Sequence, residues 1–469
     1  MRTCYFPRLN PSCKLSSSFP PGSGCAQKFA NVSFDAVKGL RPFFLFSLLA
    51  AGLVPSHGQG AKTEQVIEEM ILTPQTGAAS EDVEIRRWQE RAGAAKATAA
   101  DFERLGWAFV AKARRSLDGF YYTLAEKTAA ASDARYGTSP ASRLLRGHVF
   151  HNEHRFTEAE KLARDLSAER GAPEDWALLS DALMEQGKLS EAIAALQKMV
   201  NLKPGLEAYS RIAQVRWLKG DLPGATAAME SAVRATSPRS AETSAWALAR
   251  LSGFYLQAGQ ITRASETATA ANRLAPDFPP ALLAAGRAYL AAGNNADALT
   301  TLQRAVTLNP LPEYQWWLAD ALRAAGRTLD ATQVEAELKR RGAASDPRTF
   351  ALFLATRNEE PATAVRLARA ELAQRADVLT HDALAWALAA SGDYPAAESE
   401  MQAALAERTR DARLFLHAGE IAQARGYAEQ AANYFAEAQP LARALTPTEG
   451  ALLARRLSVP PAQSDEFYR

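Results

Sequence analysis

The stretch PEDWALLSDALMEQGKLSEAIAALQKMVNLKP, residues 173–204, contains the pattern from which the fold of this 469-residue chain can be derived. Two stripes of apolar residues at helical spacing run through it: Trp176, Leu179 and Leu183, then Ala192, Ile193, Leu196 and Val200. Gly187 separates the stripes and Pro204 follows the second, so the pattern predicts a helical hairpin. Because neither helix is long or apolar enough to be stable alone, the hairpin must bury its apolar face against a neighbour.

The neighbours are copies of the same unit. An alanine of the second helix recurs ten times at spacings of 33 or 34 residues, apart from one spacing of 39: Ala125, Ala159, Ala192, Ala225, Ala264, Ala298, Ala331, Ala364, Ala397 and Ala431. A glycine five residues earlier recurs in seven copies, and His154 and Glu359 replace it in two others: Gly187, Gly220, Gly259, Gly293, Gly326, Gly392 and Gly426. A glycine at this place permits the positive φ with which one helix ends and the chain turns into the next.

The copies resemble the tetratricopeptide repeat, a helix-turn-helix unit of about 34 residues. The match is closest in residues 281–310, where eight residues stand in the places of the family pattern: Ala285, Gly286, Tyr289, Gly293, Ala298, Leu302, Ala305 and Pro310. The resemblance covers residues 103–440 and implies an all-α, right-handed α-solenoid of about ten such hairpins. In residues 441–469 we expect a capping helix, begun by Thr446-Pro447-Thr448-Glu449, and then a disordered tail.

The N-terminal part differs from the repeats in composition. Residues 1–41 hold six basic residues and one acidic residue, and the apolar run PFFLFSLLAAGLV follows at 42–54. That run is too short to span a bilayer but suits the h-region of a signal peptide, with small residues after it, so we interpret residues 1–60 as an extension plus a bacterial export signal. The alternatives are a short hydrophobic anchor or a buried helix. Because the segment before the run is long for a signal, we also consider that translation starts near Val37.

Composition narrows the class of protein. The three cysteines, Cys4, Cys13 and Cys25, precede the apolar run, so an exported, processed chain has no disulfide and no cysteine metal site. A formal net charge of +2 gives no reason to expect nucleic acid as a partner, and no membrane span is expected after signal cleavage. Residues 61–102 are mixed in character and are predicted to be a flexible or partly helical tether.

Candidate binding residues follow from the family resemblance. In tetratricopeptide repeats the first helix of each unit lines a groove, and carrying those positions over predicts a partner-binding set: Asp181, Glu185, Gln214, Trp217, Arg287, Trp316, Asp320, Arg323, Arg357 and Trp386. Aromatic side chains beside fixed charges are the residue types that anchor a protein or peptide segment. The alternative for each tryptophan is packing between helices.

A cluster of histidines offers a second interpretation. His148, His151 and His154 recur at a spacing of three, which places them within one arc of a helix, where two of them could share Zn²⁺ or Ni²⁺. The alternative is that they line and end a helix, because no HExxH pattern or carboxylate of known spacing accompanies them. The sequence contains no Walker loop, no G-x-S-x-G and no strand-borne GxGxxG, so we do not expect an enzyme.

These observations lead to one main functional hypothesis. We expect a non-catalytic scaffold without a cofactor, periplasmic or secreted, that binds a protein or peptide in a cell-envelope assembly. The alternative is a metal-binding or metal-handling accessory protein that uses the histidines. The sequence does not indicate an oligomeric state.

Overall fold

A computed structural model describes residues 66–116, 118–237 and 240–458. The predicted export signal and the tail after Ser458 lie outside these ranges. Within the described residues all regular elements are helices and no strand occurs, so the expected all-α repeat fold is confirmed. None of the described helices is long and apolar enough to cross a membrane.

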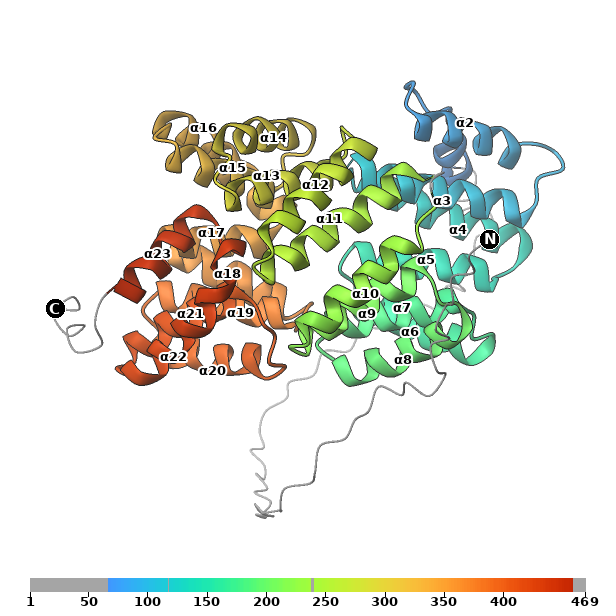
Figure 1. Cartoon of the computed structure of the whole chain (residues 1–469). Coiled ribbons are helices and arrows are strands. Elements are labelled where there is room, and N and C mark those ends of the chain that lie inside the picture. Colours follow the sequence, from blue (N-terminus) through green and yellow to red (C-terminus); the bar gives the residue numbers. More distant parts are fainter. Residues whose placement is uncertain (1–65, 117, 238–239, 459–469) are drawn as a thin grey trace, which may run out of the picture. The chain divides into compact units, whose positions relative to one another are not determined.

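The helices follow one another as ten hairpins (Figure 1). Their bounds are α3 (Ala99–Ser116) with α4 (Phe120–Tyr136), α5 (Pro140–Asn152) with α6 (Phe156–Glu169), α7 (Pro173–Glu185) with α8 (Leu189–Leu202), α9 (Leu206–Leu218) with α10 (Leu222–Arg234), α11 (Ala241–Gln257) with α12 (Ile261–Leu274), α13 (Pro279–Ala291) with α14 (Asn295–Leu308), α15 (Pro312–Ala324) with α16 (Thr328–Ser345), α17 (Pro347–Arg357) with α18 (Pro361–Leu372), α19 (Val378–Ala390) with α20 (Tyr394–Leu405), and α21 (Ala412–Ala424) with α22 (Ala428–Ala438). A helical stretch at 66–72 and α2 (Ser80–Ala92) precede them, and a 3-10 helix, η1 (Gln439–Ala444), and α23 (Pro447–Ser458) follow.

The repeated alanine is fully buried in every hairpin. All ten alanines have an exposed fraction of 0%. In every hairpin after the first, this alanine is the fourth residue of the second helix. A side chain without a γ carbon lets the backbones of the two helices approach closely, so a larger residue here would separate them. The ten-fold repeat read from the sequence is therefore confirmed.

The turns inside the hairpins have the conformation that the glycines predicted. The seven glycines have φ between 69° and 83°, and His154, which replaces one of them, has φ 59°. In the eighth hairpin the left-handed residues are Asn358 (φ 53°) and Glu360 (φ 44°), on either side of Glu359. The turn therefore keeps its left-handed step even where glycine is replaced.

Most of the residues that the irregular spacing adds lie in a helix. The 39-residue spacing falls on α11, which has 17 residues where α9 and α13 have 13 each. The first helix of the first hairpin, α3, is also long, with 18 residues. One added helical turn keeps the same face of the helix toward its neighbours, so the array tolerates it.

Residues 61–102, predicted to be a flexible or partly helical tether, contain helices that pack on the first hairpin in their described part. In the described part of that segment, Ile71, Ile85 and Ala92 are fully buried, and α2 packs against α3. The Gln89 side-chain amide donates to the carbonyl oxygens of Ile71 and Thr73, at 3.0 and 2.6 Å. The short polar runs between the helices suggested a loose chain, but the apolar faces of these helices cover the open side of the first hairpin.

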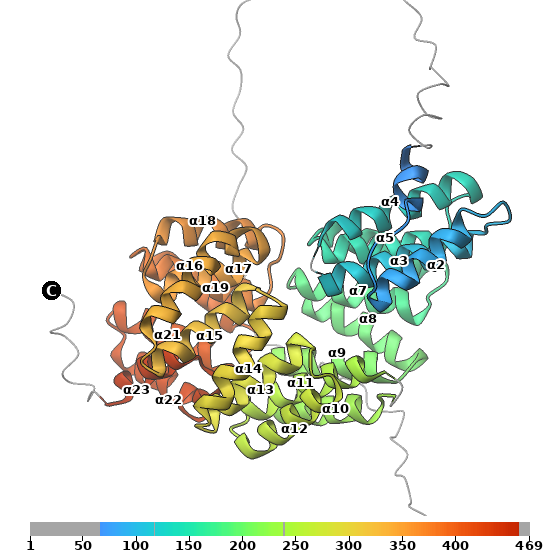
Figure 2. The ribbon, with the colours of Figure 1, turned by 90° about the horizontal axis from the view of Figure 1, so that it is seen from above.

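At the other end, α23 forms the expected capping helix. The Glu449 carboxylate accepts from the Thr446 backbone N–H at 3.0 Å, and the Glu449 N–H donates to the Thr446 hydroxyl at 3.4 Å, which is a capping box. Besides α22 and α21 in the last hairpin, α23 contacts α15, seven helices before α22 in the chain (Figure 2). The cap therefore also joins the last hairpin to a much earlier one.

Other contacts link hairpins far apart in the sequence. The Thr409 hydroxyl, in the loop between α20 and α21, donates to the Leu218 carbonyl at the end of α9 at 2.7 Å. The Gly187 turn lies directly against the Ala376 carbonyl, so that a Cβ at Gly187 would collide with that oxygen. Turns of the third and fourth hairpins thus pack against loops of the last three hairpins.

Candidate functional site

The predicted groove residues all lie on the first helices of their hairpins. Asp181 and Glu185 lie on α7, Gln214 and Trp217 on α9, Arg287 on α13, Trp316, Asp320 and Arg323 on α15, Arg357 on α17 and Trp386 on α19. The structure gives most of them partners within the chain. Binding of a second protein by these residues stays a prediction.

The two predicted groove acids on α7, Asp181 and Glu185, form ion pairs with arginines from outside their own hairpin. Arg211 on α9 contacts both Asp181 oxygens, at 2.7 and 2.6 Å. Burial tends to raise the pKa of Asp181, but the charge and hydrogen bonds of Arg211 hold it below its ordinary value. Glu185 forms an ion pair with Arg375, from the loop after α18, at 2.7 Å, and burial raises the pKa of Glu185.

Two of the predicted tryptophans bridge separate elements. The Trp217 indole N–H donates to the Gln257 side-chain oxygen at 2.8 Å and to the Arg410 carbonyl at 3.2 Å. Trp386 donates to the Thr356 hydroxyl at 3.0 Å and stacks on His417 with ring centroids 4.2 Å apart. Both side chains therefore perform the packing role that was the alternative for each tryptophan.

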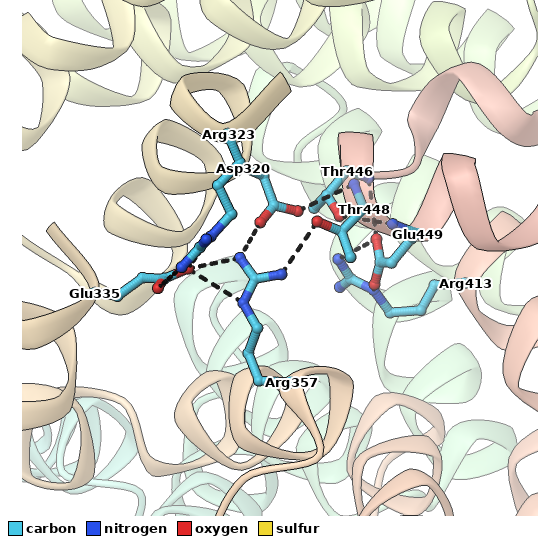
Figure 3. Close-up of polar contacts among 8 residues, drawn as sticks. All are labelled: Asp320, Arg323, Glu335, Arg357, Arg413, Thr446, Thr448 and Glu449. Carbon is cyan, nitrogen blue, oxygen red and sulfur yellow. Dashed lines mark hydrogen bonds and ion pairs between the residues drawn. The ribbon is translucent and has the colours of Figure 1, made fainter. Parts of the chain in front are cut away.

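Trp316 and the charged residues on α15 belong to an interior network. Trp316 is 2% exposed and has Arg413 over its ring, 4.9 Å from the centroid. Arg357 pairs with Asp320 and with Glu335, and Arg323 pairs with Glu335 at 2.5 Å (Figure 3). Burial tends to raise the pKa of Glu335, but the two arginines keep it below its ordinary value.

The same network reaches the capping helix. The Arg357 guanidinium donates to the Thr448 hydroxyl at 3.1 Å, and the Thr448 backbone N–H donates to Asp320 at 3.3 Å (Figure 3). Arg413 on α21 pairs with Glu449 at 2.5 Å. Helices α15, α17, α21 and α23 are thus tied together by buried charges, which leaves few of these groups available for another molecule.

An accessible pocket remains among the first helices α11, α13 and α15. It has a volume of about 200 Å³, and six of its lining residues define what we call the arginine pocket: Trp246, Arg250, Leu283, Arg287, Glu313 and Tyr314. A smaller pocket of about 80 Å³ adjoins it, since Arg287 and Glu313 line both. This second pocket extends to Asp411 and Arg413 at the start of α21.

The charges of the arginine pocket are incompletely paired. Arg250 donates to the Gln214 side chain, and Arg287 lies over the Trp317 ring, 4.8 Å from its centroid. Glu313 is 3.8 Å from Arg287. Desolvation lowers the pKa of both arginines, Glu313 opposes that change, and for Arg250 the nearby charge of Arg287 lowers it further. Two guanidinium groups facing one pocket form a site suited to an anion.

Sequence reasoning identified Arg287 and missed Arg250 and Tyr314. Arg250 lies four residues after Trp246, on the same face of α11. The family positions assume a first helix of standard length, whereas α11 is one turn longer, so Arg250 fell outside them. The 39-residue spacing was the signal that could have shifted the register.

The histidine cluster lies where α5 ends. His148 packs edge-on against Trp107, with centroids 4.9 Å apart, while His151 and His154 both contact Phe156. Burial lowers the pKa of His148 to about 3 and that of His154 to about 4. Within the described ranges, no group of three or more His, Cys, Asp or Glu side chains is arranged to hold a metal ion. Zn²⁺ or Ni²⁺ binding by two of these histidines stays a prediction, which calorimetric titration would test.

The structure is that of a helical-repeat protein with an open pocket on its first helices. The sequence profile of the tetratricopeptide repeat matches residues 144–207, 177–241, 254–310 and 283–347. These segments are therefore tetratricopeptide repeats. They include α13 and α15 of the arginine pocket, whereas Trp246 and Arg250 of α11 lie in the gap between two matched segments. No curated protein matches the chain by sequence.

Solved structures of other repeat proteins are similar to this chain. The human IFIT1 dimer with PPP-AAAA is 12% identical, with 81% of this chain and 99% of that chain covered and a TM-score of 0.45. The Cut9–Hcn1 hetero-tetramer of the APC/C is 14% identical, with 84% and 99% covered and a TM-score of 0.35. A tetratricopeptide repeat protein from Parabacteroides merdae ATCC 43184 is 18% identical, with 54% and 98% covered and a TM-score of 0.31. At these identities the similarity concerns the fold alone.

Proposed function

We propose that this protein is a non-catalytic scaffold that binds a segment of another protein in the arginine pocket. Tetratricopeptide repeat proteins generally mediate protein–protein interactions. The observation that carries the proposal is the contrast along the first helices. Most of the predicted groove residues are engaged within the chain, whereas Trp246, Arg250 and Arg287 line an open pocket.

The size of the pocket supports a protein segment as the ligand. Pockets that enclose a drug-sized molecule or cofactor have volumes of about 300–1,000 Å³. The arginine pocket has about 200 Å³ and continues into a second pocket of about 80 Å³. Such a pair of openings suits one or two side chains of a chain that passes over the surface.

An affinity capture with matched variants tests the proposal. The full-length chain and two variants, Trp246→Ala in the pocket and Tyr427→Ala at an exposed tyrosine beside α22, serve as baits in extract from the source cells. We expect a partner captured by the wild type and Tyr427→Ala to be lost with Trp246→Ala, with unchanged helical circular dichroism. If the Trp246→Ala variant still captures the partner, binding takes place on another surface and the proposal is contradicted.

The proposal extends to the place where the protein works. The apolar run at 42–54 and the basic residues before it support export and a role in a cell-envelope assembly. N-terminal sequencing of the protein from envelope and cytoplasmic fractions tests this. We expect a processed start near residue 60 in the exported fraction. An intact N-terminus found only in the cytoplasmic fraction would contradict export.

A further inference from the structure

We propose that the arginine pocket recognises the side-chain carboxylate of an acidic residue in the partner protein, held between Arg250 and Arg287. This inference rests on the proposed function and specifies the chemistry of its ligand. Guanidinium groups bind carboxylates through paired, charge-assisted hydrogen bonds, which give direction as well as affinity.

The first argument comes from the other arginines near the first helices. Five of them have a carboxylate oxygen within 2.7 Å: Arg211, Arg323, Arg357, Arg375 and Arg413. Among the described residues, the carboxylate nearest to Arg287 is that of Glu313, at 3.8 Å, and Arg250 donates to the neutral side chain of Gln214. Arg250 and Arg287 therefore differ from these five arginines, because neither has a carboxylate oxygen within hydrogen-bond distance among the described residues.

The second argument is a buried donor without an acceptor. The Arg287 Nε atom is buried and lacks a hydrogen-bond partner among the described residues. A buried donor without a partner destabilises a protein unless something supplies an acceptor. Pairing within the chain therefore leaves the Arg287 guanidinium incompletely satisfied, and a carboxylate that enters the pocket would pair with its charge and screen the two guanidinium groups from each other.

The third argument concerns charge and shape. The pocket lining holds two arginines and one glutamate, a net charge of +1. Trp246 and Leu283 add apolar walls, against which the methylene groups of a glutamate, or an apolar neighbour in the sequence, could pack. The occupant that fits is therefore an acidic residue with apolar residues beside it.

Glu313 has a distinct place in this inference. It is the acid of the pocket, and at 3.8 Å from Arg287 it partly neutralises the guanidinium at a distance too long for a hydrogen bond. An incoming carboxylate must tolerate its negative charge. Removing that charge should therefore strengthen binding, which is the opposite of what removing either arginine should do.

Selection from a phage-displayed library of random 12-residue peptides on the full-length chain provides the probe. We expect the selected peptides to carry an Asp or Glu beside apolar residues, and to bind about tenfold more weakly when that acid is replaced by its amide. Arg250→Gln and Arg287→Gln should each weaken the best peptide about tenfold, and Glu313→Gln should strengthen it severalfold. Arg304→Gln, on the exposed part of α14 where Arg304 pairs with Asp277, is the matched control and should have no effect.

The outcomes separate this inference from the proposed function. Peptides that lose binding with Trp246→Ala but are indifferent to the exchange of acid for amide would overturn the carboxylate inference alone. Peptides that bind equally well to the Trp246→Ala variant would overturn both. Weaker binding to Glu313→Gln would also contradict the inference, because it would show that Glu313 contacts the ligand directly.

Discussion

At the scale of single residues, buried titratable groups connect pH to stability. Burial tends to raise the pKa of Asp181 and of Glu449, but arginine partners hold both below their ordinary values. Such acids stabilise the fold above their unfolded pKa, and the contribution is lost as pH falls through the folded value. His148 behaves in another way, because no acid among the described residues forms an ion pair with it, and it packs against Trp107 in its neutral form.

The low pKa of His148 predicts a loss of stability in mild acid. Its pKa is about 3 in the folded chain against 6.5 for the free side chain, so below pH 6.5 only the unfolded chain takes up this proton. The free energy of unfolding should therefore fall between pH 7 and pH 5, and His148→Phe should reduce that fall by about 1–2 kcal/mol. Urea unfolding at the two pH values measures it. An identical fall in the variant would show that other groups are responsible. The acids that arginines hold below their ordinary pKa, such as Asp181 and Glu449, act in a lower range, below about pH 4.5, in both proteins.

At the scale of elements, the ends of the array show how repeats are closed off. A hairpin in the middle buries both of its faces against neighbours, whereas a terminal hairpin needs a cover. At the start, α2 supplies that cover with Ile85 and Ala92, and the Lys112 ammonium on α3 pairs with Asp82 at 2.8 Å. At the end, α23 does so with Leu453 and the Thr446 capping box.

The packing of α2 predicts a sharp difference between two of its residues. Ile85 is fully buried and Val83 is 52% exposed. Ile85→Ala should lower the free energy of unfolding by about 2–4 kcal/mol, since it removes buried methyl groups and leaves a cavity. Val83→Ala should change it by less than about 0.5 kcal/mol. Urea unfolding followed by circular dichroism compares them. A small effect of both substitutions would show that this segment is the loose tether the sequence suggested.

At the scale of the whole molecule, contacts between distant hairpins complement those between neighbours. Thr409 donates to the Leu218 carbonyl across 191 residues, and Trp217 donates to Arg410 across 193. In a repeat array that lacks such contacts, stability is a sum of terms between adjacent repeats. Here the third and fourth hairpins also depend on the last three, so we expect these hairpins to unfold together.

Two turn glycines provide a matched test of these distant contacts. Gly187 and Gly293 have φ of 70° and 82°, so alanine is strained at either position. At Gly187 the added Cβ would also collide with the Ala376 carbonyl, whereas at Gly293 it would meet nothing within 4 Å. Gly187→Ala should therefore lower the free energy of unfolding by about 1–3 kcal/mol more than Gly293→Ala. Equal losses in urea unfolding would mean that the contact between Gly187 and Ala376 contributes nothing to stability.

The sequence could predict much of the fold and little of the site. Apolar spacing, the turn glycines and the repeated alanines predicted the ten hairpins, because each of these signals acts within one unit. The groove residues were assigned to the correct helices, yet Asp181 and Arg357 proved to be engaged in ion pairs across hairpins. Arg250 was missed because one additional turn in α11 moved it out of the expected register.

The sequence by itself determined the helices, their turns and their repetition, since helical periodicity and positive φ are properties of residues close together in the chain. The tertiary structure decided which side chains of the first helices remain available. Asp320 and Thr448, or Trp217 and Arg410, meet only because small rotations between successive hairpins accumulate until distant ones touch. No local sequence pattern encodes these accumulated rotations. The pairing that leaves Arg250 and Arg287 beside an open pocket therefore appears only in the folded chain.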